Sequence, residues 1–267
     1  MQALHPASSR TTLRKWLAAG RVRVNGVVVR RGDRPVDAGD RLQLGPAPPP
    51  AFPAPLRLVH EDDDLLVVDK PPGLLTIATA HERERTVYRL LSDYVAGLSG
   101  RRIFIVHRLD RETSGLLVFA RSPDVKRHLQ SQFEARSVER LYVAVVEGRV
   151  REASGVLRGR LVQDPARRVR PTRDPRRGQE AITRYRVLAH GRDTTRLELS
   201  LVTGRRGQIR VQLAELGHPI VGDRLHGSRR DPLRRLCLHA TRLAFTDPRG
   251  RRVHFESRPP AGFQRLA

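Results

Sequence analysis

A proline-rich segment divides this chain before a fold can be assigned to either side of it. Residues 45–55 hold six prolines in eleven positions. Proline has no backbone N–H to donate and a fixed φ angle, so such a run favours extended polyproline II over helix or sheet. We therefore expect a small domain over residues 1–45, a semi-rigid linker over 46–55 and a larger domain over 56–267.

The charge of the chain predicts a polyanionic partner. A formal net charge of +23 and a pI near 11.6 attract polyanions, of which nucleic acid is the usual one. The 51 basic residues are nearly all arginines, a preference that coding bias could produce. Coding bias does not readily explain why there are only 28 acidic residues, so we favour a polyanionic partner over a merely basic surface.

Residues that would indicate disulfides, metals or a membrane are sparse. Cys237 is the one cysteine, which excludes a disulfide within the chain and a CxxC zinc pair. The ten histidines show no HExxH pairing, and no apolar run reaches the length of about 18 residues that spans a membrane. The N-terminus lacks a secretory pattern. We expect a cytoplasmic protein that needs no metal, no membrane and no obligate protein partner.

The small domain has a basic helix followed by a hairpin. Apolar residues at helical spacing after two serines predict a helix over residues 9–20. Valines on both sides of Asn25-Gly26 predict a tight hairpin, and residues 41–44 a closing strand. The pattern SRTTLRKWLAAGRVRVNGVVV…VDAGDRLQL resembles an S4 RNA-binding domain. The resemblance implies that Arg10, Arg14, Lys15, Arg21 and Arg23 contact RNA phosphates. The alternative is a small basic module without a role in RNA binding.

A reactive carboxylate is indicated in the larger domain. Asp110 lies between Arg108 and Arg111 in a polar turn that leads into the apolar stretch 114–120. The neighbouring cations favour its ionised form, and a buried strand behind it would supply a rigid mount. Residues 107–115, HRLDRETSG, resemble the HRLDxxTSG motif of the RluA-type pseudouridine synthases. The resemblance implies that Asp110 is essential for catalysis.

Two further segments carry the same resemblance. Residues 140–148 match the RxYxAxVxG strand of that family, which implies that Tyr142 is an active-site tyrosine that would stack on the uracil and could help remove the C5 proton. Residues 203–223 match its TGRxHQIRVHLxxxGHPIxGD motif, which implies that Arg210 pairs with Asp110. The match departs at Gly207 and Gln212, where the family commonly has histidine, and this could alter RNA contacts or rigidity. RNA contacts at the site are expected from His107, Arg108, Arg205 and Arg206.

The remaining elements follow from periodicity. We expect strands over 56–60, 65–70, 139–148, 180–188 and 195–202, and helices over 86–98 and from Ser122-Pro123 to Phe133. Another helix after Gly207 would bury Ile209, Leu213 and Leu216. Residues 158–180, which are rich in arginine and proline, predict a loop or an irregular hairpin.

The resemblance implies an α+β catalytic domain around a mixed, mostly antiparallel sheet, preceded by the small S4-like domain. It implies isomerisation of uridine to pseudouridine in structured RNA without an external cofactor. The target uridine would have to leave its stack, and Asp110 would act either as nucleophile or as the base at C2′. The S4-like domain favours 23S rRNA over tRNA as substrate. The alternatives are a catalytically silent RNA-binding or ribosome-assembly factor and a nonspecific DNA-binding protein.

Overall fold

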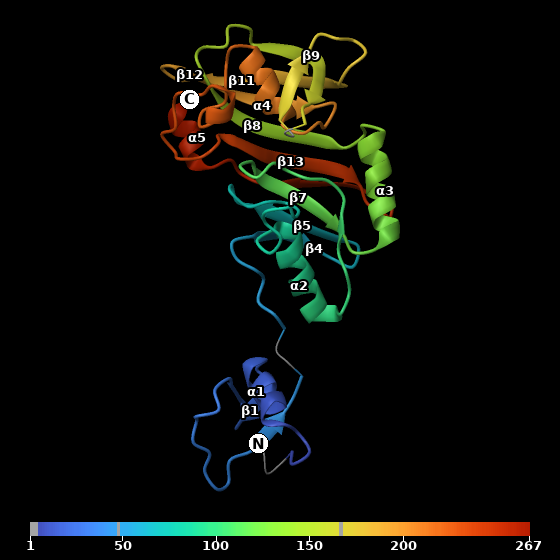
Figure 1. Cartoon of the computed structure of the whole chain (residues 1–267), viewed down its shortest axis with the longest axis vertical. Helices are drawn as coiled ribbons and strands as arrows, with labels where there is room; N and C mark the ends of the chain where they lie inside the picture. The colour runs from blue at the N-terminus through green and yellow to red at the C-terminus, as the bar shows by residue number, and fades with distance from the viewer. Residues whose placement is uncertain (1–4, 47–48, 166–167) are drawn as a thin grey trace. The chain divides into compact units, whose positions relative to one another are not determined.

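The computed structural model describes residues 5–46, 49–165 and 168–267. The chain forms two compact units, Met1–Ala51 and Phe52–Ala267 (Figure 1). The boundary falls inside the proline-rich residues 46–55, of which 47 and 48 lie outside the described residues. The last part of this segment belongs to the larger unit, because the ring of Phe52 packs edge-on against Tyr94 at 5.1 Å.

The small unit has the expected helix and hairpin. Helix α1 (Arg10–Ala18) begins at Ser9, whose side chain accepts a hydrogen bond from the Thr12 N–H. Strands β1 (Val22–Val24) and β2 (Val27–Val29) are joined by Asn25 and Gly26, both in the left-handed region. Strand β3 (Leu42–Leu44) pairs antiparallel with β1. The helix and hairpin predictions are confirmed.

The larger unit is built on one mixed sheet. Its described residues form eleven strands in the order β10-β9-β11-β12-β8-β13-β7-β5-β4, with β14 beside β13 and β6 beside β7. Of the pairs described, β13 with β7 alone is parallel. The expected mixed, mostly antiparallel sheet is therefore confirmed. The strands are β4 (Arg57–Glu61), β5 (Leu65–Lys70), β6 (Phe104–Ile105), β7 (Ser114–Ala120), β8 (Glu139–Glu147), β9 (Ser154–Gln163), β10 (Val169–Thr172), β11 (Gln179–His190), β12 (Thr194–Leu201), β13 (Leu238–Thr246) and β14 (Arg252–Glu256).

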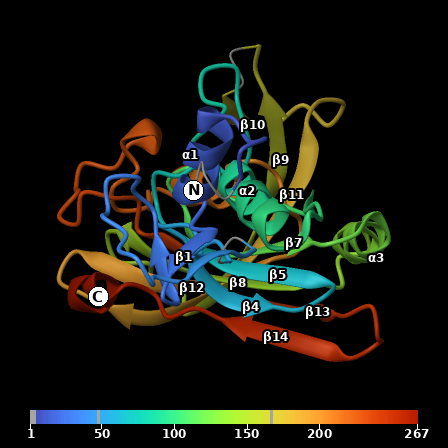
Figure 2. The ribbon, with the colours of Figure 1, turned by 90° about the horizontal axis from the view of Figure 1, so that it is seen from below.

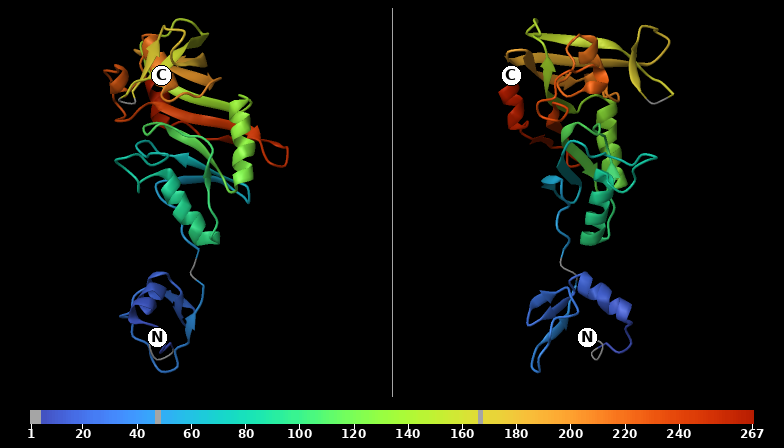
Figure 3. Two further views of the ribbon diagram at one scale, coloured as in Figure 1. Left: turned by 45° about the vertical axis from the view of Figure 1, so that its right-hand side comes forward. Right: turned by 60° about the vertical axis from the view of Figure 1, so that its left-hand side comes forward.

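Helices cover this sheet at several places. Helix α2 (Val87–Ser99) and helix α3 (Pro123–Glu134) confirm the two expected helices, and each is capped by the side chain of the residue before it. Alternate side chains of β5 pack toward different helices: Leu66 and Val68 share a core cluster with α2, and Leu65 and Val67 share another with α3. Figures 2 and 3 show the two helices at different places beside the sheet. Helix α4 (Gln208–Glu215), a 3₁₀ turn (Arg224–His226) and α5 (Ala261–Leu266) complete the unit. No described helix has both the length and the apolar character needed to cross a membrane.

The interpretation of residues 158–180 as a loop is wrong, and the alternative of a hairpin describes them better. Strand β9 continues to Gln163 and pairs antiparallel with β10, and β11 begins at Gln179. Residues 166–167 lie outside the described residues. Leu161 and Ala181 pack beneath Val211 of α4. The strand period was hard to recognise because arginines fill most of the outward positions between such apolar residues.

The expected apolar face of α4 is also only partly right. Ile209 and Leu213 are buried, but Leu216 is 39% exposed because the helix ends at Glu215. Two glutamines, Gln208 and Gln212, occupy the buried face instead.

Candidate active site

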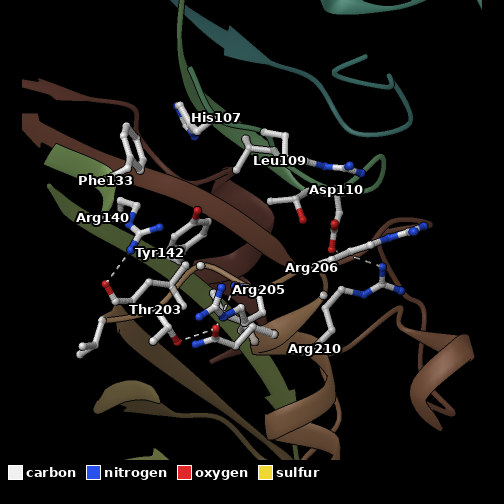
Figure 4. Close-up of a pocket in the computed structure, with 18 of the residues that line it drawn as sticks. His107, Leu109, Asp110, Phe133, Arg140, Tyr142, Thr203, Arg205, Arg206 and Arg210 are labelled. Carbon is white, nitrogen blue, oxygen red and sulfur yellow. Dashed lines mark hydrogen bonds and ion pairs between the residues drawn. The ribbon is translucent and has the colours of Figure 1, made fainter. Parts of the chain in front are cut away.

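A pocket of ≈ 520 Å³ lies over β8 in the larger unit (Figure 4). Three segments form most of its lining: the loop before β7, the chain from the end of α3 into β8, and residues 201–210. The structure thereby brings together seven residues that the sequence predicted at the site, which are His107, Arg108, Asp110, Tyr142, Arg205, Arg206 and Arg210.

Asp110 is placed where a ligand in the pocket can reach it. Its side chain is 20% exposed, and its Oδ2 lies 3.7 Å from Nη1 of Arg210. Arg108 and Arg206 are exposed at the pocket rim. The proximity of Asp110 and Arg210 agrees with the expected pair, although the distance is that of a loose ion pair.

The closer partner of Arg210 is Asp223. Nε and Nη2 of Arg210 each donate a hydrogen bond of 2.7 Å to this carboxylate, whose side chain is 1% exposed. Nδ1 of His226 lies 2.9 Å from both carboxylate oxygens. Burial alone would raise the pKa of Asp223, but the hydrogen bonds from Arg210 and His226 lower it to about 2. Sequence reasoning missed Asp223, although it is the last residue of the matched 203–223 motif.

The loop that carries Asp110 is fixed on both sides. Before it, the Thr76 hydroxyl donates to the Leu109 carbonyl and accepts from the Leu109 N–H. After it, the carbonyl of Arg111 accepts from the Gly73 N–H and from the ammonium of Lys70. The Asp110 backbone is therefore held from the 70–76 turn, whose KPPG sequence could have indicated this.

Lys70 anchors that turn from within the core. It is 0% exposed, and its Nζ also donates to the carbonyls of Pro71 and Leu74, at 2.8 Å each. Burial lowers the pKa of Lys70 to about 7, while the negative charges of Glu112 and Asp110 oppose the shift. The three carbonyl acceptors favour the charged ammonium.

Tyr142 forms the wall of the pocket on β8. It is buried, and burial raises the pKa of its phenol to about 12; Arg140 lowers that value and Asp110 raises it further. The phenol is therefore neutral at physiological pH. Tyr142 therefore lies near a cation, Arg140, and an anion, Asp110, which shift its pKa in opposite directions.

Beyond Tyr142 the wall continues as a stack of side chains. The rings of His107 and Phe133 stack at 4.9 Å, and the Arg140 guanidinium lies 5.4 Å from the Phe133 centroid. Nε2 of His107 accepts a hydrogen bond from the Val118 N–H. Burial, assisted by Arg140, lowers the pKa of His107 to about 3, so its ring is neutral. An RNA contact by His107 stays a prediction, and it would be made by a neutral ring.

The two departures from the family motif have visible local roles. Gln212 accepts a hydrogen bond from Thr183 and donates two to strand carbonyls, and so ties α4 to the sheet. Gly207 precedes α4 with φ +59°, a conformation that favours glycine. A Cβ there would lie 4.0 Å from Asp110 Oδ2, so glycine leaves space beside the carboxylate.

The five predicted RNA contacts of the small unit lie on α1, on β1 and at Arg21, directly before β1. Arg10, Arg14 and Lys15 are exposed on α1. Arg21 lies over the Trp16 ring and donates to the Gly45 carbonyl, and Arg23 donates to the Gly26 carbonyl. Their contacts with RNA stay a prediction. Among the described residues no group of three His, Cys, Asp or Glu side chains is placed to hold a metal ion.

Comparison with known proteins gives the family. Residues 64–215 match the RNA pseudouridylate synthase family model, and residues 1–42 match the S4 domain. A protein of Haemophilus ducreyi named ribosomal large subunit pseudouridine synthase D is 32% identical over 98% of this chain and 87% of its own length. The protein of that name from Xylella fastidiosa is 38% identical over 84% of this chain and 69% of its own.

Solved structures agree on the fold. Human RNA pseudouridylate synthase domain containing 4 has a TM-score of 0.64 and 25% identity, covering 78% of this chain and 90% of that one. Human RNA pseudouridylate synthase domain containing 1 has a TM-score of 0.65 at the same identity, covering 77% and 84%. The chain belongs to the RNA pseudouridylate synthase family and carries an S4 domain at its N-terminus.

Proposed function

We propose that this protein isomerises uridine to pseudouridine in 23S ribosomal RNA, with Asp110 as the catalytic residue. The observation that carries the catalytic part is the partly exposed Asp110 carboxylate, held on a fixed loop at 3.7 Å from Arg210. The choice of rRNA is supported by relatives named as synthases of the large ribosomal subunit and by the S4 domain, whose arginines and lysine would contact phosphates.

The reaction needs no group beyond side chains. The N1–C1′ bond of uridine breaks, the uracil turns, and a C5–C1′ bond forms, while C5 loses a proton and N1 gains one. Asp110 either attacks C1′ or removes the proton at C2′, and both routes require its ionised form. Arg210 favours that form electrostatically and orients the carboxylate.

Asp223 keeps Arg210 paired while the charge of Asp110 changes during the reaction. Asp110 loses its negative charge when it forms an adduct or takes a proton, so it then no longer neutralises Arg210. A buried unpaired cation is costly, but the two hydrogen bonds of 2.7 Å to Asp223 remain. The arginine therefore stays in place through the reaction.

Tyr142 would hold the uracil rather than act as a base. With a pKa of about 12 its phenol seldom ionises at neutral pH, so it offers a flat, neutral surface against which the base can stack. Holding the uridine out of its helix costs a few kcal/mol of lost stacking, which contacts of Arg108, Arg205 and Arg206 with the RNA backbone would offset.

Release of tritium from 5-tritiated uridine tests the proposal. Transcripts of 23S rRNA and of tRNA are incubated separately with the protein. We expect release from the rRNA. Release from tRNA alone would contradict the substrate assignment, and tight binding without release from either RNA would support a silent binding or assembly factor.

A further inference from the structure

Arg140 is a partly buried cation in the pocket wall, and no described carboxylate neutralises it. It lies on β8, two residues before Tyr142, and its guanidinium is placed over the Phe133 ring. Its Nη2 donates to the Leu201 carbonyl at a long 3.3 Å, and its buried Nε has no hydrogen-bond partner. Burial lowers its pKa, because the charged form loses contact with water.

The other partly buried arginine of the pocket differs in this respect. Arg210 is paired with Asp223 and Asp110, whereas no described carboxylate forms an ion pair with Arg140. Burying a charge without a partner is costly, and the incompletely bonded guanidinium of Arg140 lines the pocket, where a ligand can supply an acceptor. The guanidinium also lies close to the backbone of Gly204, where an added Cβ would overlap Nη1 and would displace it.

A base fits this donor better than a phosphate does. The exposed rim arginines, Arg205 and Arg206 among them, suit the RNA backbone, whereas Arg140 lies deeper, beside aromatic rings. Figure 4 shows Arg140 and Asp110 on opposite sides of Tyr142. If C1′ of the target nucleotide is at Asp110 and the uracil lies on Tyr142, the edge of the base far from the sugar points toward Arg140. That edge carries the C4 carbonyl.

We propose that Arg140 recognises the C4 carbonyl of the target uracil and so distinguishes uracil from cytosine. This inference rests on the proposed function. A guanidinium has only donors, so it pairs with the uracil O4, which is an acceptor. Cytosine presents an amino group at the same position, which would leave two donors facing each other and both unsatisfied. Rejection of such a mismatch is strong where the site excludes water.

The test compares binding of two RNAs. The uridine that the unaltered protein modifies is first mapped in a 23S rRNA transcript by tritium release, and a fragment is then made with uridine or cytidine there. Dissociation constants are measured for the unaltered protein, Arg140→Met and Arg140→Gln. We expect the unaltered protein to prefer uridine by roughly tenfold or more, from one charge-assisted hydrogen bond.

Both variants should lose most of this preference for different reasons. Methionine offers no donor, and glutamine can present either its amide N–H or its carbonyl, so it accepts both bases. Arg206→Met is the control: it removes an exposed rim charge and should weaken binding of both RNAs by the same factor. Thermal unfolding of Arg140→Met should not occur at a lower temperature, because the substitution removes an uncompensated buried charge.

The outcomes separate the two claims. If the folded variants still prefer uridine by the same factor, the role of Arg140 is wrong and the function is unaffected. If Arg140→Met does not fold, Arg140→Gln decides the question by the same ratio. Release of no tritium from any RNA by the unaltered protein would overturn the function and this inference with it.

Discussion

Arg210 is shared unequally between two carboxylates, and the distances define their roles. Asp223 receives two hydrogen bonds of 2.7 Å, whereas Asp110 lies at 3.7 Å and remains open to the pocket. We interpret Asp223 as a positioning residue that acts through Arg210.

Asp223→Asn tests this interpretation. The amide keeps the shape but not the charge, so one charge-assisted pair is lost and Arg210 can turn away. We expect the single-turnover rate to fall by about 10–100-fold, and the free energy of unfolding in urea to fall by roughly 3 kcal/mol. Asp193→Asn, at an exposed pair with Arg230, is the control and should change stability by under about 0.5 kcal/mol. A normal rate in Asp223→Asn would contradict the interpretation.

The neutral ring of His107 predicts a pH effect on stability. Its pKa is about 3 when folded and about 6.5 when unfolded, so the unfolded chain binds the extra proton. This contribution is complete above pH 6.5 and is lost as the pH falls toward 3. In urea unfolding between pH 4 and 6, His107→Gln should reduce the slope of free energy against pH by at most about 1.4 kcal/mol per unit. The same substitution at exposed His254 should leave the slope unchanged, and an unchanged slope in His107→Gln would show that its ring ionises normally.

The junction of β7 and β13 is the element that mounts the Asp110 loop. Gly115 has φ +112°, and a Cβ there would overlap the backbone of Ala240 in the parallel neighbour. Just beside it, the Ser114 hydroxyl bonds to His239 of β13 at 2.8 Å. Close contact of the two backbones therefore sets the position from which the loop leaves the sheet.

Gly115→Ala is expected to disrupt this junction. The strands would have to separate, so we expect destabilisation by more than about 3 kcal/mol or failure to fold, measured by thermal unfolding. Gly159→Ala on β9 is a matched control, because nothing lies within 4 Å of its added Cβ. Normal stability of Gly115→Ala would mean that the two strands are less closely held than the structure shows.

Elements with strong local signals were predictable, and those defined by distant contacts were not. The cap at Ser9, the start of a helix after Ser122 and the Asn25-Gly26 turn depend on neighbouring residues, and they were predicted. The burial of Gln212 depends on strand carbonyls more than twenty residues away in sequence, so no period of α4 reveals it. The partnership of Asp223 with Arg210 likewise needs the fold, although the motif contained both residues.

For the whole molecule, the charge of +23 predicts binding that depends steeply on salt. If α1 contacts phosphates, replacing its three exposed basic residues with glutamine should reduce the slope of log affinity against log salt by about 2–3, measured by fluorescence anisotropy with 23S rRNA. The same loss of charge on the β14 side of the larger unit should leave the slope nearly unchanged, and equal effects of the two sets would contradict a specific role for α1. The two sets are Arg10, Arg14 and Lys15, and Arg249, Arg252 and Arg258.

The central claim is that the Asp110 carboxylate performs the isomerisation. The most direct measurement is tritium release from 5-tritiated uridine in 23S rRNA by Asp110→Asn, compared with Glu112→Gln, which neutralises an exposed carboxylate two residues away. We predict that Asp110→Asn binds the RNA with normal affinity and releases no tritium, while Glu112→Gln stays active. Retention of a tenth or more of the normal rate by Asp110→Asn would contradict the account.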